Sequence, residues 1–256
     1  MSKVIFAGID GCRGGWFGVF LSGDDWEKCE WKIGVFKTFS SLVDQIIKEY
    51  NSSEFLIMVD MPIGLKEGNN GPRLSDLEAR KLLKARKSSI FPVPCREAAY
   101  AEDYKKACEV NEKLTGTQIS KQAWNILPKI RDLDTFLIEE EIFREKIKEI
   151  SPEICFQEFK GLPMKYSKKT QEGFLERKKV LETFCPFVDD LIKTALLKYK
   201  RQELAKDDIL DAFIAAVTAK YGYRFGFEYA SCKPEIDKKG LKIQLVYCIP
   251  KIKDLN

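Results

Sequence analysis

The chain has 256 residues, of which 45% are hydrophobic and 32% charged, so it can form one large domain with an ample core. Its net charge of +4 is too small to indicate nucleic-acid binding by itself, and the absence of histidine excludes Ser-His-Asp and Cys-His catalysis. The eight cysteines form no CxxC pair, which disfavours a zinc site and favours a cytoplasmic protein with reduced thiols. The sequence has neither a signal-peptide layout nor an apolar run long enough to span a membrane, so no membrane association is expected.

The N-terminal segment Val4–Leu21 predicts a hairpin of two buried strands. Val4–Ile9 is almost entirely apolar, which is typical of a central strand, and Asp10 follows it directly. Three glycines in the next five residues allow a sharp turn before the chain becomes apolar again. Asp10 is therefore a candidate functional carboxylate at the end of a strand, although an Asp can also simply begin a turn through its side chain.

A strand, a helix and another strand are predicted next, and they end in a second carboxylate. Lys28–Phe36 alternates as a strand does, and Ser40–Tyr50 has helical spacing with Ser40 as its cap. Phe55–Val59 is a short apolar strand that ends in Asp60. Because a crossover helix joins parallel strands, we expect Asp60 to lie beside Asp10.

Residues from about 70 to 150 are predicted to form a helical insertion between strands of the core. The helical pattern starts at Leu74 and continues in helices over Ala98–Leu114 and Lys121–Lys148. The second of these is expected to be interrupted at Pro128.

After the insertion, Ser151–Phe159 is predicted as a strand whose alternation places Glu153 on one face. A helix is expected from Thr170 to about Tyr199, with a break at Pro186. The C-terminal region is predicted to end in a strand or hairpin, without a definite place in the sheet.

The last helix, Lys206–Tyr221, carries two aspartates on one face, Asp208 and Asp211, with Asp207 as a potential N-cap. Acidic residues are favoured in a first helical turn by the helix dipole. The dipole does not explain Asp211, which stands among apolar neighbours where a lone carboxylate is costly to bury. A metal ion or a basic partner would relieve that cost.

Four carboxylates on three separate elements thus become candidates for one site: Asp10, Asp60, Asp208 and Asp211. Converging carboxylates repel one another unless a cation lies among them, and oxygen-only ligands favour Mg²⁺ or Mn²⁺. A pair of such ions can catalyse phosphodiester hydrolysis without histidine.

Several sequence blocks, in this order, resemble those of an uncharacterised family regarded as RNase H-like nucleases. They are GIDGCRGGW, VDMPIGL, ARKSSIFPVPCRE, QAWNILPKIRDLD, SPEICFQEFKG with SKKT, and DDILDAFIAAVTA, and they cover nearly the whole chain. The late helix also resembles the Asp-x-x-Asp-Ala helix of RuvC-type resolvases, in which the two aspartates bind metal.

The resemblance implies an α/β fold of one RNase H-like domain over residues 1–256, a mixed sheet flanked by helices with a large helical insertion. The core would consist of residues 1–65 and 150–256. The four aspartates would bind metal and, with Glu153, form the catalytic set. The family usually has His-Pro-Glu where this chain has Ser151-Pro152-Glu153, so Glu153 is a secondary candidate.

Polar and basic residues within the family blocks are candidate contacts for substrate phosphates. They are Arg13, Arg86, Ser88, Ser89, Arg96, Gln122, Lys129, Arg131, Lys168 and Lys169. Each can equally be an ordinary surface residue. Trp16 and Trp124 could stack on bases, but core packing is the preferred interpretation for both, and Cys12 is interpreted as a small packing residue rather than a reactive thiol.

Three functions remain open at this point. The first is a metal-dependent nuclease or phosphodiesterase acting on nucleic acid or a nucleotide. The second is a phosphotransferase of the actin and sugar-kinase type, whose first strand also reads Gly-Ile-Asp-Gly but which needs a second Gly-rich phosphate loop that this chain lacks. The third is a non-catalytic RNase H-like module that binds nucleic acid or serves as a scaffold.

Overall fold

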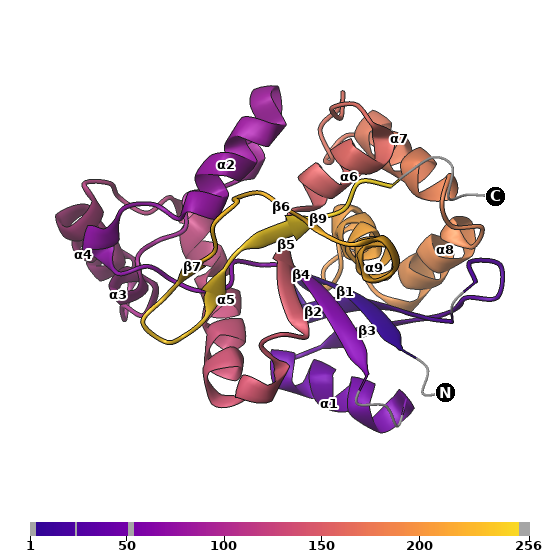
Figure 1. The fold of residues 1–256 in the computed structure, drawn as a ribbon, viewed down its shortest axis with the longest axis horizontal. Helices are drawn as coiled ribbons and strands as arrows, with labels where there is room; N and C mark the ends of the chain where they lie inside the picture. The colour runs from indigo at the N-terminus through magenta and orange to yellow at the C-terminus, as the bar shows by residue number, and fades with distance from the viewer. Residues whose placement is uncertain (1–3, 24, 51–53, 251–256) are drawn as a thin grey trace. The chain divides into compact units, whose positions relative to one another are not determined.

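The structure, a computed structural model, describes residues 4–23, 25–50 and 54–250 (Figure 1). Its contacts divide the chain into two units. The first contains Met1–Asp60, Lys146–Glu228 and Val246–Asn256, and the second contains Met61–Glu145 and Tyr229–Leu245. None of the helices among the described residues has the length and apolar character needed to traverse a bilayer.

A seven-stranded mixed sheet is the centre of the fold, with the strand order β3-β2-β1-β4-β5-β9-β6. The strands are β1 Ile5–Cys12, β2 Gly15–Ser22, β3 Glu30–Phe36, β4 Phe55–Asp60, β5 Ile147–Ile150, β6 Glu228–Tyr229 and β9 Leu245–Tyr247. The first three strands form an antiparallel meander, β4 runs parallel to β1, and β5 runs parallel to β4. This sheet with its flanking helices confirms the predicted RNase H-like α/β fold class.

The predicted hairpin and crossover are both present. Cys12 pairs with Gly15 across the β1–β2 turn, and helix α1 (Phe39–Tyr50) joins β3 to β4. The prediction that Ser40 caps this helix is wrong. The cap is Thr38, whose hydroxyl accepts a hydrogen bond from the backbone N–H of Ser41 at 3.2 Å.

Helices cover both faces of the sheet, and adjacent residues of β2 show which helix covers which face (Figure 1). Trp16 packs edge-on against Phe39 of α1, with ring centroids 5.2 Å apart. The next residue, Phe17, points to the opposite face because strand side chains alternate, and it packs against Tyr199 at the end of α8 (Val188–Lys198). Trp16 is therefore a core residue, as preferred from the sequence.

Helix α9 (Lys206–Phe225) lies against β1 at a glycine. The ring of Phe6 is 5.3 Å from that of Tyr223, near the C-terminal end of α9. Two residues on, a Cβ atom on Gly8 would lie only 2.0 Å from the carbonyl oxygen of Ala212 and 2.1 Å from the backbone nitrogen of Ala216. The strand and helix backbones therefore approach more closely than any side chain would allow.

The segment after β5 differs from its prediction. Ser151–Phe159 is not a strand, because Pro152–Lys160 forms helix α6 and the strand is the preceding four residues. Proline is favoured in the first turn of a helix, where its missing N–H needs no partner, and Pro152 occupies that place. The predicted break at Pro186 is confirmed, since it separates α7 (Gln171–Glu182) from α8.

The second unit is mainly helical. Its helices are α2 Leu74–Leu83, α3 Arg96–Ala99, α4 Tyr104–Thr115 and α5 Lys121–Glu139, with short 3₁₀ segments at Gly68–Asn70, Lys84–Ser89 and Glu141–Phe143 and the strand pair β7 Glu235–Ile236 and β8 Lys242–Ile243. One continuous helix over Ala98–Leu114 was predicted, and this is wrong. The side chain of Asp103 accepts a hydrogen bond from the backbone N–H of Lys106 at 2.8 Å and so begins a separate helix, α4.

Helix α5 also differs from its prediction, because it continues through Pro128 and ends at Glu139 rather than Lys148. The proline removes one backbone hydrogen bond. Buried residues on both sides of it, including Leu127 and Ile130, hold the helix against the core of the unit.

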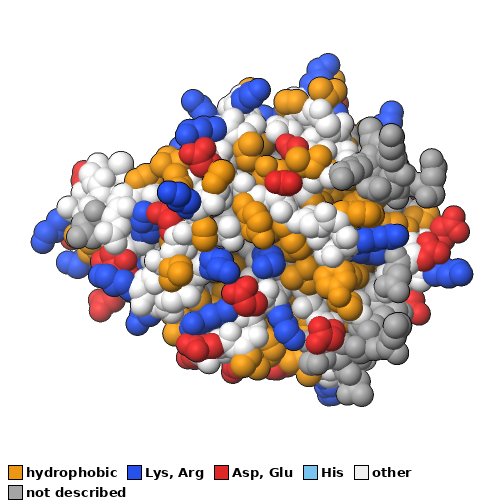
Figure 2. All heavy atoms as spheres, viewed as in Figure 1, with side chains coloured by type: hydrophobic (Ala, Val, Ile, Leu, Met, Phe, Trp, Pro, Cys, Tyr) orange, Lys and Arg blue, Asp and Glu red, His pale blue; other side chains and the backbone are white. Residues whose placement is uncertain are grey.

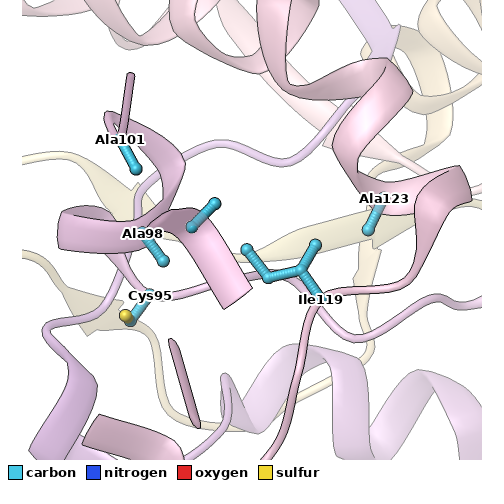
Figure 3. Close-up of a cluster of buried hydrophobic side chains, with 6 residues drawn as sticks. Cys95, Ala98, Ala101, Ile119 and Ala123 are labelled. Carbon is cyan, nitrogen blue, oxygen red and sulfur yellow. The ribbon is translucent and has the colours of Figure 1, made fainter. Parts of the chain in front are cut away.

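A small cluster of buried side chains joins α3 and α4 to the start of α5 (Figure 3). Its members are Cys95, Ala98, Ala101, Ala107, Ile119 and Ala123. Trp124 is partly buried against this cluster, so packing accounts for it as preferred from the sequence. Because most of these side chains are small, the segments pack closely.

The contact between β1 and α9 gives a first prediction. Gly8→Ala should lower the free energy of unfolding by about 3 kcal/mol or more, at the upper end of overpacking effects, because its Cβ would meet backbone atoms that cannot rotate away. Gly34→Ala is the matched control, because the atoms nearest to the added Cβ belong to the ring of Phe36, a side chain that can move. Urea denaturation of both variants measures their free energies of unfolding. Equal losses in the two variants would show that the backbone contact at Gly8 is no more rigid than the side-chain contact at Gly34.

Candidate metal centre

Three carboxylates from three elements of the first unit meet at one place. Asp10 lies near the end of β1, Asp60 is the last residue of β4, and Asp211 lies in the second turn of α9. Each contributes one oxygen, and these three oxygens lie within 4.8 Å of one another. Asp10 and Asp211 are buried, whereas Asp60 is partly exposed.

The backbone fixes this meeting point. Asp10 and Asp60 are direct partners in the parallel β1–β4 ladder, so their side chains leave the sheet on the same face. Asp10 follows Gly8 by two residues and therefore shares the face that α9 covers. The helix runs antiparallel to β1 there, since Phe6 meets its C-terminal end, and this direction brings Asp211 toward Asp10.

Asp208, the fourth predicted ligand, lies beside this triad but has a second task. Its carboxylate accepts a hydrogen bond from the backbone N–H of Ala205 at 3.0 Å, which secures the start of α9. The residue at the N-cap position is Ala205, so the prediction that Asp207 caps the helix is wrong. The negative charge of Asp208 still contributes to raising the pKa of Asp10.

Burial and mutual repulsion make these carboxyl groups hard to ionise. Burial, followed by the charges of Asp60, Asp208 and Asp211, raises the pKa of Asp10 well above its ordinary value. Burial also raises the pKa of Asp60 to about 7, although the nearby Lys168 ammonium opposes the shift. The pKa of Asp208 rises to about 6, chiefly through burial.

Lys168 enters the cluster from the loop between α6 and α7. Its Nζ lies 2.5 Å from Oδ2 of Asp211, and its side chain remains 38% exposed while that of Asp211 is 1% exposed. The charge of Asp211 raises the pKa of Lys168 well above its ordinary value, so the ammonium persists. Lys168 was predicted as a phosphate contact, as was Lys169, whose side chain is exposed.

Glu153, the secondary catalytic candidate, forms a buried ion pair rather than joining the triad. Its Oε2 accepts a hydrogen bond from the guanidinium of Arg177 at 2.7 Å, and both side chains are almost fully buried. Arg177 also donates to the backbone oxygens of Tyr166 and Gly173. The pair therefore connects α6, α7 and the loop that carries Lys168.

Sequence reasoning missed Glu149, a buried acidic residue of β5 that pairs in the sheet with Val59, next to Asp60. Its charge contributes to raising the pKa of Asp60. The signal in the sequence is weak, because residues 147–150 read Ile-Lys-Glu-Ile, with two adjacent charged residues between the isoleucines instead of the alternation of a half-buried strand. It was obscured because the preceding charged residues have helical spacing.

The triad fits a divalent cation in its chemistry and its spacing. Carboxylate oxygens are the donors preferred by Mg²⁺, Mn²⁺ and Ca²⁺. Two metal–oxygen bonds of roughly 2.0–2.6 Å span about 4–5 Å, which matches the separation of at most 4.8 Å between the three oxygens. The buried acidic cluster can thus hold a divalent ion, without the geometry selecting which one.

The other predicted substrate contacts lie in several segments. Arg13 is exposed in the β1–β2 turn, next to Cys12, whose pKa burial raises. Arg86, Ser88 and Ser89 lie in the 3₁₀ segment after α2, and Gln122, Lys129 and Arg131 lie on α5, all within the second unit. The guanidinium of Arg131 lies over the ring of Trp124, with its central carbon 5.8 Å from the ring centroid.

Arg96 forms ion pairs within the second unit. It contacts Asp134 at 2.7 Å and Asp237 at 2.5 Å, and Asp237 also accepts a hydrogen bond from the backbone N–H of Leu65. These bonds connect the segment 229–245 to the helices of the unit. A phosphate contact by Arg96 would require it to leave two carboxylates.

Charged side chains of both signs are interspersed on the face of the molecule drawn in Figure 2. Among the described residues of this face, Lys and Arg side chains lie among acidic and apolar groups, in places two or three near one another (Figure 2).

The fold belongs to the RNase H-like α/β class, and a comparison with family models gives the family of the chain. The chain matches the model described as "Protein of unknown function (DUF429)" over residues 8–226, and it belongs to that family. Neither the curated proteins nor the solved structures include a significant match.

The raised pKa of Asp60 predicts how the stability of the metal-free protein depends on pH. In the folded protein Asp60 keeps its proton up to a pH of about 7, whereas in the unfolded chain it loses it near 3.8. The folded state therefore binds more protons between these values, and its stability falls as pH rises through this window. In EDTA, the difference in free energy of unfolding between pH 5 and pH 8 should be smaller for Asp60→Asn than for the parent.

Asp44→Asn, an exposed change on α1, is the control and should follow the parent. Urea denaturation across the pH range provides the free energies. If Asp60→Asn kept the whole pH dependence of the parent, the charge of Asp60 would not oppose folding.

Proposed function

We propose that this protein is a divalent-metal-dependent phosphodiesterase of the nuclease type, acting on nucleic acid or a nucleotide. The observation that carries the proposal is the triad of Asp10, Asp60 and Asp211, delivered to one point by two parallel strands and a buried helix. Burying several like charges together is costly, so a cation that neutralises them supplies the reason for the arrangement.

Mg²⁺ or Mn²⁺ would be held by the three aspartates, with Asp208 close enough to adjust the local charge. Such an ion supplies Lewis acidity toward a phosphate oxygen and lowers the pKa of water. The chain supplies the positions: the β1–β4 ladder sets the separation of Asp10 and Asp60, and the contact at Gly8 sets the depth of Asp211. In the metal-free protein the pKa of Asp60 is raised to about 7, so binding of a cation near neutral pH would displace its proton.

One observation favours a second candidate, a non-catalytic RNase H-like module. The ammonium of Lys168 already offsets part of the negative charge of the triad without any metal ion. A module of this kind would retain the carboxylates for structure alone, so metal binding separates the two functions.

Asp10→Asn tests the proposal, because it removes one charge at almost constant volume. In the metal-free state the variant should be as stable as the parent or more stable, since a buried repulsive charge is lost. Its metal-dependent hydrolysis of a phosphodiester should fall at least ~100-fold, as is typical when a key electrostatic group is removed. The measurements are thermal unfolding in EDTA and turnover with Mn²⁺.

Mn²⁺ should also raise the melting temperature of the parent, because a ligand at 100 times its dissociation constant contributes roughly 2.7 kcal/mol. This stabilisation should shrink greatly in Asp10→Asn and persist in Asp44→Asn. A loss of about 1 kcal/mol or more in metal-free Asp10→Asn, with an intact response to Mn²⁺, would make Asp10 a turn residue.

The substrate proposal predicts a salt-dependent contribution from the second unit. Alanine at Arg86, Lys129 or Arg131 should weaken nucleic-acid binding and reduce the slope of log K against log salt by about one unit each, because each phosphate contact releases a counterion. Lys113→Ala, an exposed change on α4, is the control and should leave the slope unchanged. Unchanged slopes in all three variants would assign these residues to the structure of the unit.

A further inference from the structure

We propose that Lys168 is a built-in cation of the metal centre, so that the site takes one divalent ion beside the ammonium rather than a pair of ions. This inference rests on the proposed function, because it concerns the same centre. It names a residue that acts on the affinity and stoichiometry of the ion.

The first support is the place of the ammonium. It contacts Oδ2 of Asp211, one of the three residues that each offer an oxygen to an ion. The charges of Asp10 and Asp60 also act on Lys168, so the ammonium lies within the field of all three aspartates. It therefore occupies a position in which a second metal ion would otherwise be stabilised.

The second support is the way in which the loop before α7 is fixed. Glu176 accepts hydrogen bonds from the backbone N–H groups of Lys165 and Tyr166 and pairs with Lys160 at 2.6 Å. On the C-terminal side of Lys168, the backbone N–H of Thr170 donates to the backbone oxygen of Ser167 at 3.0 Å, and the hydroxyl of Thr170 accepts a hydrogen bond from the backbone N–H of Gly173 at 3.1 Å.

The buried guanidinium of Arg177 adds a third restraint, since it donates to the backbone oxygen of Tyr166 at 3.2 Å. A surface lysine normally loses side-chain entropy when it is held in one ion pair. Here the backbone on both sides of Lys168 is already held, so that cost is confined to its own rotamers. The loop is thus built to deliver this side chain to Asp211.

The ammonium also changes the charge that an ion would meet. It offsets one of the negative charges of the triad, beside which the charges of Asp208 and Glu149 also act. A second divalent ion would have to bind close to both the first ion and the ammonium. Like charges a few ångströms apart repel by at least ~1 kcal/mol even in water. With one ion bound, the ammonium would stand beside it as a second group able to attract the oxygens of a substrate phosphate.

Isothermal titration of the full chain with MnCl₂ tests the inference. The parent should bind one Mn²⁺, and Lys168→Met should bind its first Mn²⁺ at least tenfold more tightly, because a repelling charge is gone. Lys169→Met is the matched control, since it removes the same charge from the adjacent exposed position, and its affinity should stay within about threefold of the parent.

Lys168→Arg keeps the charge and should bind one ion with an affinity close to that of the parent, which makes it the informative variant if Lys168→Met does not fold. Two ions bound by the parent, or equal first-ion affinities in Lys168→Met and the parent, would overturn the role of Lys168 and leave the phosphodiesterase proposal standing. No Mn²⁺ binding in any variant would overturn both. One ion, a tenfold gain and no phosphodiester hydrolysis by the parent would support the role of Lys168 and overturn only the activity.

Discussion

The contact between the backbones of β1 and α9 at Gly8 is the constraint on which the rest of the first unit depends. Because no side chain separates them, a polar group on the helix can reach the end of a buried strand. The small residues of α9 that face β1, Ala212 and Ala216, serve the same close approach. A larger residue at any of these positions would move Asp211 away from Asp10 and Asp60. The geometry of the acidic cluster therefore depends directly on the packing of the core.

The acidic cluster opposes the stability that this packing provides. Burial and repulsion raise the pKa values of its members, which means that their charged forms are unfavourable in the folded protein. The ammonium of Lys168 lowers the cost, and the buried pair of Glu153 and Arg177 secures the loop from which Lys168 comes. Groups kept at a cost to stability are typical of functional sites rather than of structural cores.

Much of the first unit could be predicted from the sequence, because its signals are local. An apolar run that ends in a carboxylate indicates a buried strand with a polar end, and a helix between two such strands indicates parallel pairing; Asp10 and Asp60 follow from these two rules. Asp211 could be recognised because a carboxylate among apolar residues needs a partner.

The features that the sequence did not reveal depend on tertiary contacts or on competing periods. The strand of Glu149 is only four residues long and follows charged residues with helical spacing, so its period was ambiguous. The helix after it was mistaken for a strand, although Pro152 is a recognised residue of a first helical turn. The partners of Lys168 and Arg177 could not be predicted, because long side chains on a loop or a helix can reach many places.

The burial of α9 also determines how rigidly the acidic cluster is held. Fourteen consecutive residues of this helix, Ile209–Gly222, are buried, so its backbone amides should exchange with solvent only when the core itself opens. Asp211 lies within this stretch, and Asp10 and Asp60 lie on the central strands against which the helix packs. The entropy of ordering these three side-chain positions is therefore lost when the chain folds and not when an ion binds. An ion that bound between these carboxylates would therefore meet ligands that are already positioned by the fold, without the cost of ordering a backbone segment.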